Sequence, residues 1–117
     1  DRYYSAIYLS AKELFEALVK VKLEKSEDQK YLLLIEEVYE SDMLIIDDLG
    51  SELFNHFTTS EFFHIINRRV NTEKSTIIST NLSLDEMRDI YSERVTSRIR
   101  KSFMYIRLFG NDIRAKL

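Results

Sequence analysis

Apolar positions recur along the chain with two different periods, and each period predicts one type of element. Short apolar runs rich in β-branched and aromatic residues predict strands over residues 3–9, 43–46, 75–80 and 103–109. Apolar residues spaced by three and four predict helices over residues 11–24 and 31–39, after residue 58, after residue 83 and over residues 92–101. Strands therefore alternate with helices along the chain.

A serine or threonine followed three residues later by glutamate marks a helix start, because the two side chains satisfy amides left over in the first turn. This capping pattern occurs at Ser10 with Glu13, Thr58 with Glu61, and Ser83 with Glu86. The predicted strands are apolar on both faces and are separated by helices. This order is typical of an α/β domain whose mostly parallel sheet is flanked by helices.

The composition limits the class of protein. The 117 residues fit one domain, and 44% hydrophobic with 32% charged residues is ordinary for a soluble globular chain. The absence of cysteine excludes a disulfide framework, a thiolate nucleophile and a cysteine-rich zinc site. No apolar run is long enough to span a bilayer and no signal peptide opens the chain, so we expect a cytoplasmic protein without a membrane partner.

The glycines exclude one kind of nucleotide site. Only Gly50 and Gly110 occur, so a glycine-rich loop that cradles phosphate cannot form within these residues. The chain by itself therefore cannot be a complete P-loop or dinucleotide-binding protein. Because the sequence begins with Asp1 and not with methionine, we expect an N-terminal part of the natural protein to precede it.

The net charge of −3 is unevenly distributed. Residues 1–87 contain 9 Lys and Arg against 17 Asp and Glu, whereas residues 88–117 contain 8 against 3. A basic C-terminal quarter on an acidic body indicates an anionic partner, such as nucleotide phosphate or a nucleic-acid backbone. Balance of charge within one domain is an equally good interpretation.

Polar residues with suitable chemistry end two of the predicted strands, where ligands bind in parallel sheets. After residues 43–46, Asp47 can bind Mg²⁺ through water, and Asp48 can orient or deprotonate an attacking water. Asn81 ends the next strand, and its amide can bind a phosphate oxygen and a water. The alternative is that these residues only mark the turns that end strands.

Arg94 and Arg98 are four residues apart and therefore lie on one face of the helix predicted over residues 92–101. Two guanidinium groups on one face are suited to a phosphate, including one held by a neighbouring subunit. The alternative is a solvated basic face partly paired with Glu93. The two histidines, His56 and His64, have no carboxylates at metal-binding spacing and are interpreted as surface or boundary residues.

Four segments, in this order and spacing, resemble one family: LIIDDLGSE, ISTNLSLDEM, YSERVTSRI and LFGNDIR. They are similar to the AAA+ ATPase domain of the bacterial helicase loaders of the DnaC and DnaI type, whose relatives include the IstB-like transposition helpers. The resemblance covers nearly the whole chain, up to Arg114. It implies that residues 1–117 are a partial AAA+ domain, a P-loop NTPase core without its first strand and without the P-loop, also called Walker A.

The resemblance implies a role for each candidate residue. Asp47 corresponds to the Mg²⁺-associated acid of the Walker B motif. Asp48 stands where many AAA+ proteins have a glutamate that activates water, and Asn81 resembles the sensor of the γ-phosphate. Arg98, with Arg94 as second choice, is expected to act as an arginine finger on the nucleotide of a neighbouring subunit.

The resemblance further implies that Arg114 is a second sensor arginine and that ATP and Mg²⁺ are the cofactors. Both cofactors need the missing Walker A segment, so we expect ATP hydrolysis by the intact domain and not by this fragment. The implied function is ATP-dependent loading of a replicative helicase onto single-stranded DNA in DNA replication. The implied partners are that helicase, the DNA, and further copies of the chain when ATP is bound.

In the family, the lost first strand lies between the last strand and the strand that precedes Asn81. We therefore expect a gap there, closed by rearrangement, by dimerisation or by strands from a partner. An IstB-like transposition helper is an alternative within the family. A non-catalytic adaptor with an ATPase-like fold is an alternative outside it, and the order of acids and strands argues against a phosphate-accepting receiver domain.

Overall fold

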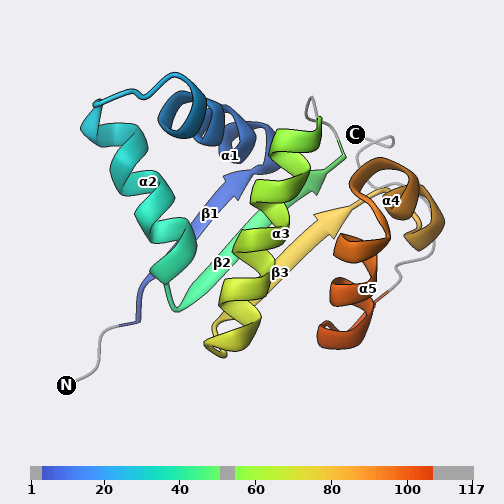
Figure 1. Ribbon diagram of the computed structural model, residues 1–117. Helices are drawn as coiled ribbons and strands as arrows, with labels where there is room; N and C mark the ends of the chain where they lie inside the picture. Colours follow the sequence, from blue (N-terminus) through green and yellow to red (C-terminus); the bar gives the residue numbers. More distant parts are fainter. Residues whose placement is uncertain (1–3, 51–54, 107–117) are drawn as a thin grey trace, which may run out of the picture.

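The structure of the chain is a computed structural model that describes residues 4–50 and 55–106 (Figure 1). Its described strands are β1 (Ala6–Ser10), β2 (Met43–Leu49) and β3 (Ser75–Thr80). The helices between and after them are α1 (Ala11–Leu18), the π-helical turn η1 (Val19–Leu23), α2 (Gln29–Glu40), α3 (His56–Asn71), α4 (Leu84–Tyr91) and α5 (Glu93–Ser102).

The three strands form one parallel sheet in the order β1-β2-β3. Met43 at the start of β2 pairs with Ala6 on one side and with Ser75 on the other, so all three strands begin at the same edge. The predicted α/β class with a parallel sheet and flanking helices is confirmed. β3 has the predicted bounds, and β1 and β2 each begin or end within three residues of the prediction.

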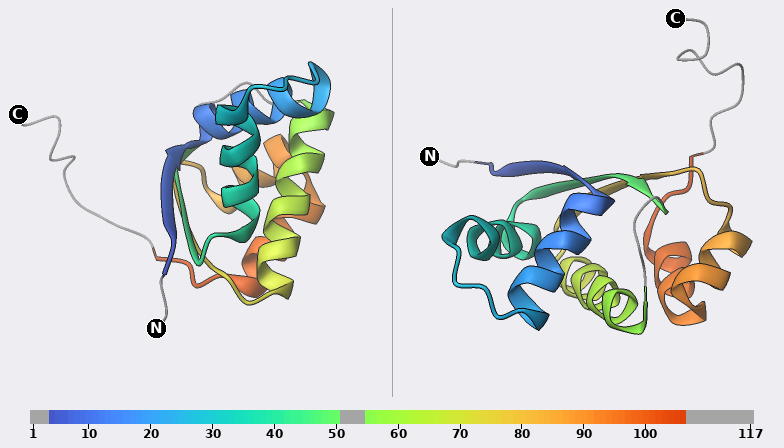
Figure 2. Two further views of the ribbon diagram at one scale, coloured as in Figure 1. Left: turned by 90° about the vertical axis from the view of Figure 1, so that its left-hand side faces the viewer. Right: turned by 90° about the horizontal axis from the view of Figure 1, so that it is seen from above.

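All of the described helices lie on one face of the sheet, as the two views in Figure 2 show. The reason is topological: both crossovers move in the same direction across the sheet, and right-handed crossovers in one direction place their helices on one side. The other face, here called the open face, has none of the described helices against it. Its side chains are those of Ala6, Tyr8, Met43, Ile45, Asp47, Ser75, Ile77 and Ser79.

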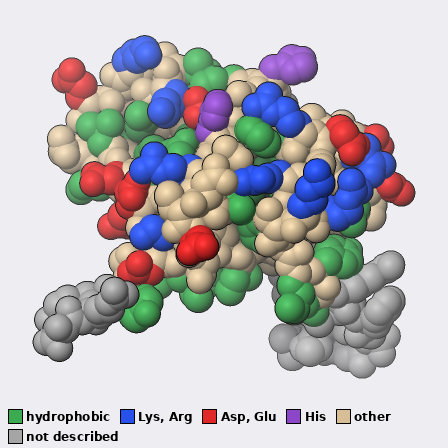
Figure 3. Space-filling model, turned by 60° about the horizontal axis from the view of Figure 1, so that its bottom comes forward, with side chains coloured by type: hydrophobic (Ala, Val, Ile, Leu, Met, Phe, Trp, Pro, Cys, Tyr) green, Lys and Arg blue, Asp and Glu red, His purple; other side chains and the backbone are tan. Residues whose placement is uncertain are grey.

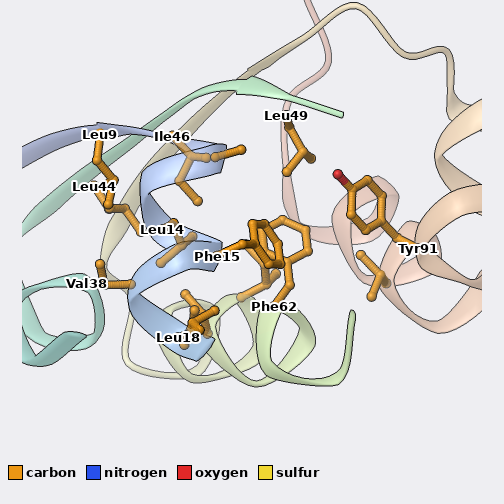
Figure 4. Close-up of a cluster of buried hydrophobic side chains, with 14 of the residues drawn as sticks. Leu9, Leu14, Phe15, Leu18, Val38, Leu44, Ile46, Leu49, Phe62 and Tyr91 are labelled. Atoms are coloured by element: carbon orange, nitrogen blue, oxygen red, sulfur yellow. The ribbon is translucent and has the colours of Figure 1, made fainter. Parts of the chain in front are cut away.

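The hydrophobic core lies between the covered face and the helices (Figure 4). Alternate residues of β2, such as Leu44 and Ile46, are fully buried there because successive strand residues point to opposite faces. The ring of Phe62 on α3 packs against Phe15 at 5.8 Å and against Tyr91 at 5.5 Å between centroids. These three rings connect α1, α3 and α4 in one continuous core.

The predicted capping boxes are confirmed at Ser10 and Ser83, whose side chains accept from the amides three residues later. The third box, at Thr58 with Glu61, is wrong. The side chain of Asn55 caps α3 instead, by accepting a hydrogen bond from the backbone N–H of Thr58. In return, the hydroxyl of Thr58 accepts from the backbone N–H of Asn55. The hydroxyl of Thr58 is therefore used inside the first turn, and α3 begins earlier than predicted.

The predicted strand over residues 103–109 is not confirmed. Residues 103–106 belong to no strand, and the remaining three lie outside the described residues. A strand needs a hydrogen-bonded neighbour, and the resemblance assigns that place to the first strand, which this sequence does not contain. The exposed side chains of Met104 and Ile106 agree with an apolar segment that lacks a sheet partner here.

Arg69 of α3 is completely buried and ties together three elements. Its guanidinium donates to the carbonyl of Val38 at 3.0 Å, to the carbonyl of Ser75 at 2.7 Å and to the hydroxyl of Thr76 at 2.8 Å. Val38 lies in the last turn of α2, where carbonyl groups have no partner within the helix and carry partial negative charge. Arg69 therefore fixes α2 and β3 to α3.

Replacing Arg69 with methionine should destabilise the domain by about 3 to 5 kcal/mol, because buried carbonyl groups lose their charged donor. The matched control is Arg68→Met on the same helix. Arg68 forms an exposed ion pair with Glu40, so its loss should cost less than about 1 kcal/mol. Urea unfolding followed by circular dichroism measures both, and equal shifts of the two midpoints would contradict the assignment.

Asp42 links the starting ends of the three strands. Its carboxylate accepts from the backbone N–H of Ser5 at 2.9 Å and forms an ion pair with Lys74 at 3.7 Å. The N–H of Ser5 is the largest influence and lowers the pKa of Asp42, Lys74 acts in the same direction, and desolvation opposes them. A lowered pKa means that the ionised carboxylate stabilises the folded chain.

That stabilisation is fully present above the unfolded-state pKa of about 4 and is lost as the pH falls through the lower pKa of the folded state. Asp42→Asn should therefore unfold more easily than the wild type at pH 7, and the difference should shrink below about pH 4. Thermal midpoints measured from pH 7 down to the acid range give this comparison. A difference that stays constant with pH would exclude the ionised carboxylate as its cause.

Candidate functional site

The candidate acids lie at the carboxyl end of the central strand, next to the end of β3. Asp47 and Asp48 are in β2, and Asn81 directly follows β3. The hydroxyl of Thr80 donates to the carbonyl of Leu49 at 2.6 Å and thereby joins the two strand ends. The structure thus brings the three predicted residues to one edge of the sheet.

Asp47 and Asp48 lie within a β-bulge of β2. Ile46 pairs with Ile78 and Leu49 with Thr80, so β2 has one residue more than β3 over this stretch. Asp48 takes the left-handed conformation with φ of 61°, which is uncommon for a residue other than glycine. Bulges and strained backbone often occur at functional sites, where they turn side chains away from the regular alternation.

Both carboxylate oxygens of Asp47 accept hydrogen bonds from hydroxyl groups on the neighbouring strands. Ser79 donates to Oδ1 at 2.6 Å and Tyr8 donates to Oδ2 at 2.7 Å. The hydroxyl of Ser79 also accepts from the backbone N–H of Asp48 at 2.9 Å. The bond to Asp47 raises the pKa of Tyr8, because losing the donated proton would place two negative charges side by side.

Tyr8 and Ser79 are absent from the set predicted from the sequence. Position 79 precedes Asn81 by two residues, so strand alternation could have signalled it. Nothing local distinguishes Tyr8, since it lies 39 residues from Asp47 and meets it only because β1 and β2 are neighbours.

Gly50 allows the chain to leave β2 immediately after the acids. Its φ of +110° is rarely adopted by residues with a side chain, and a Cβ atom would lie 2.9 Å from the Cδ1 atom of Leu82. Gly50→Ala should therefore destabilise the domain by about 1 to 3 kcal/mol.

The same substitution made in a Leu82→Ala background separates the two causes. Because the tip of a leucine can move, most of the cost should remain in that background, where only backbone strain is left. Urea midpoints of the four proteins measure this coupling. Disappearance of the cost in the Leu82→Ala background would show that contact with Leu82, and not the value of φ, requires glycine.

Both candidate arginines are on α5, where Arg94 is exposed and Arg98 is half-buried. The guanidinium of Arg94 stacks on the ring of Phe63 at 4.0 Å, and that of Arg98 donates to Asn71 at 2.6 Å. Asn71 ends α3, which has 16 residues and is therefore about 24 Å long. Because α3 returns the chain from the carboxyl end of the sheet to its starting end, the structure does not bring Arg98 to the acids.

The acidic partner considered for these arginines is engaged elsewhere. Glu93 forms its ion pairs with Arg88 and with Arg100 at 3.8 Å. Figure 3 shows arginine and lysine side chains spread over the surface that α3, α4 and α5 present. Arg114, the expected second sensor, lies outside the described residues.

The remaining sequence-based expectations concern metals and membranes. His56 and His64 are exposed on α3, as predicted. Within residues 4–50 and 55–106, no group of three or more histidine, aspartate or glutamate side chains could hold a metal ion. None of the helices in this part of the chain is both long and apolar enough to cross a membrane.

The side chains at this edge of the sheet nevertheless have the type of ligand atom that Mg²⁺ prefers. Asp47, Asp48 and Asn81 offer only oxygen donors and an amide, and Mg²⁺ prefers oxygen ligands while retaining much of its water. Few protein ligands are needed for such an ion, because nucleotide phosphates and water complete its shell. The site is therefore suited to a nucleotide-bound Mg²⁺ rather than to a metal held by the protein alone.

Comparison with known proteins shows to which family the chain belongs. The model of the family described as IstB-like ATP binding protein matches residues 2–100. The chain belongs to this family. Its predicted resemblance to the AAA+ domains of the DnaC and IstB type is thereby confirmed. DnaA, the chromosomal replication initiator protein of Cereibacter sphaeroides, is 31% identical over 94 residues, which are 80% of this chain and 19% of DnaA.

Solved structures of replication proteins share the fold of this IstB-like chain. The DnaC helicase loader superposes with a TM-score of 0.68 and 30% identity over 86% of this chain and 58% of the loader. The replication initiator DnaA bound to AMPPCP and single-stranded DNA gives 0.69 and 28% over 86% of this chain and 30% of DnaA. AMPPCP-bound DnaA from Aquifex aeolicus gives 0.69 and 26% over the same shares. The chain thus spans less than two thirds of each of these proteins.

Proposed function

We propose that this chain is the distal part of an AAA+ ATPase domain that loads a replicative helicase onto single-stranded DNA. The observation that carries the proposal is the meeting of Asp47, Asp48 and Asn81 at the carboxyl edge of a parallel sheet. Similarity to the DnaC helicase loader, and to DnaA with AMPPCP and single-stranded DNA, supports the choice of nucleotide and DNA.

In this proposal each residue at the edge has one task. Asp47 accepts hydrogen bonds from water molecules bound to Mg²⁺, Asp48 orients or deprotonates the attacking water, and Asn81 binds the γ-phosphate and that water. Mg²⁺ contributes charge neutralisation at the phosphates when it is bound. An aspartate at position 48 is shorter than the glutamate common in AAA+ proteins, so slow hydrolysis is expected.

The open face is evidence for a further segment that supplies the P-loop, because the helix after such a loop would pack on this face. The expected first strand of the family would lie next to β3, on the side away from β2. The connection from that strand to β1 would cross the sheet in the direction opposite to the connections from β1 to β2 and from β2 to β3. Since it is also right-handed, its helix packs on the opposite face. That is the open face, where Ile77 is 50% exposed and Tyr8 is 64% exposed. A strand, P-loop and helix in this place would bring phosphate-binding amides to the edge that carries the aspartates.

The position of Arg98 supports action on a neighbouring subunit. Its contact with Asn71, at the far end of α3, keeps it away from the acids of its own chain. A helix face that carries the exposed Arg94 and the half-buried Arg98 is suited to a nucleotide held by a second copy. Assembly of several copies in the presence of ATP follows from this arrangement.

In the full-length protein, Arg98→Ala should lower kcat for ATP hydrolysis by about a thousandfold, because an arginine finger acts on the transition state. ATP affinity, measured by fluorescence of a nucleotide analogue, should stay nearly unchanged. Arg100→Ala, on the same helix, is the matched control and should retain activity. Loss of nucleotide binding in Arg98→Ala would mean that Arg98 acts within its own subunit or supports the fold.

Mixing of two inactive variants tests action between subunits. Arg98→Ala retains the acids and Asp48→Asn retains the finger, so a mixed oligomer contains some complete sites. Recovery of hydrolysis on mixing is expected. Recovery would also exclude the non-catalytic adaptor, whereas wild-type full-length protein that neither binds nor hydrolyses ATP would favour it.

The family match also favours a second candidate, an IstB-like transposition helper. A loader should form an ATP-dependent complex with the replicative helicase of its host and place it on a single-stranded DNA circle. A transposition helper should leave the helicase off the DNA. Counting DNA-bound helicase with and without the protein distinguishes the two.

A further inference from the structure

Two side chains that contact Asp47, Tyr8 and Ser79, have no role implied by the family. Tyr8 is on the open face of β1 and is 64% exposed, so its ring adds little to the core. Its hydroxyl nevertheless donates to Oδ2 of Asp47 over 2.7 Å, a short hydrogen bond to an acidic group. Among the described residues, its side chain therefore contributes mainly through this one contact.

The strand register explains how Tyr8 reaches Asp47. Tyr8 lies opposite Ile45, and Ser10 lies opposite Asp47. Tyr8 and Asp47 are thus diagonal neighbours on the open face, at a distance that long aromatic side chains can span. A shorter side chain at position 8 would not reach the carboxylate.

Ser79 provides the second hydroxyl group that contacts the carboxylate of Asp47. It donates to Oδ1 of Asp47 over 2.6 Å from the strand on the other side. One hydroxyl therefore contacts each carboxylate oxygen, from β1 and from β3. Two donors on opposite sides restrict rotation of the carboxylate about its bond to Cβ, which a single donor would not do.

We propose that Tyr8 is a positioning residue for Asp47, holding its carboxylate with Ser79 in the orientation that receives Mg²⁺-bound water. This inference rests on the proposed nucleotide site and adds a residue to it. Groups that orient metal-associated carboxylates typically change metal affinity or activity by about 10- to 100-fold when they are removed. Tyr8 acts through Asp47 and does not itself contact the nucleotide.

The test uses the full-length protein and the variant Tyr8→Phe, which removes the hydroxyl and keeps the ring. Affinity for a fluorescent ATP analogue is measured in EDTA and across a Mg²⁺ titration. The variant should need about 10-fold more Mg²⁺ for half-maximal tightening, with the affinity in EDTA unchanged. The Mg²⁺ concentration for half-maximal ATP hydrolysis should rise in parallel.

Tyr4→Phe is the matched control, since Tyr4 is also exposed and precedes β1. It should behave as the wild type. Ser79→Ala should shift the Mg²⁺ dependence in the same direction as Tyr8→Phe. The thermal midpoint of each variant shows whether the fold is intact.

Two outcomes would overturn the inference: a Mg²⁺ dependence of Tyr8→Phe equal to that of the wild type, or an equal loss of affinity with and without Mg²⁺. The second would mean that Tyr8 supports the fold. A wild-type protein whose nucleotide affinity does not respond to Mg²⁺ would instead refute the proposed function. The two failures are therefore distinguishable.

Discussion

Parallel pairing of β2 with both of its neighbours is the constraint on which the rest of the structure depends. Parallel strands cannot be joined by a tight turn, so each connection crosses the sheet as helix. Both crossovers are right-handed and run in the same direction, which places α1, α2 and α3 on one face. The same pairing gathers the carboxyl ends of the strands at one edge, where Asp47 and Asn81 lie.

The two ends of the sheet are stabilised differently. At the starting end, Asp42 and the buried Arg69 satisfy backbone groups of several elements and hold them in place. At the carboxyl end, hydroxyl groups from two strands converge on one carboxylate, and the backbone at Asp48 and Gly50 has positive φ.

The open face connects the fold to the proposed activity. A sheet face with half-exposed apolar residues such as Ile77 is not a stable outer surface, and a helix of a further segment would cover it. In the proposed domain that helix follows the P-loop, so covering the face and completing the nucleotide site are one event. Under this proposal, this chain would contribute the acids, the sensor and the finger, and the further segment would contribute the phosphate-binding loop.

The sequence by itself determined the order and type of the described elements, because apolar periodicity and capping are properties of neighbouring residues. It failed at the start of α3, where Asn55 and not Thr58 is the N-cap, and at residues 103–106, which form no strand. Family resemblance located Asp47 and Arg98, but it did not reveal what holds them. Only the tertiary structure decided that Tyr8 contacts Asp47 and that Asn71 holds Arg98, because these pairs are 39 and 27 residues apart and meet only through packing of whole elements.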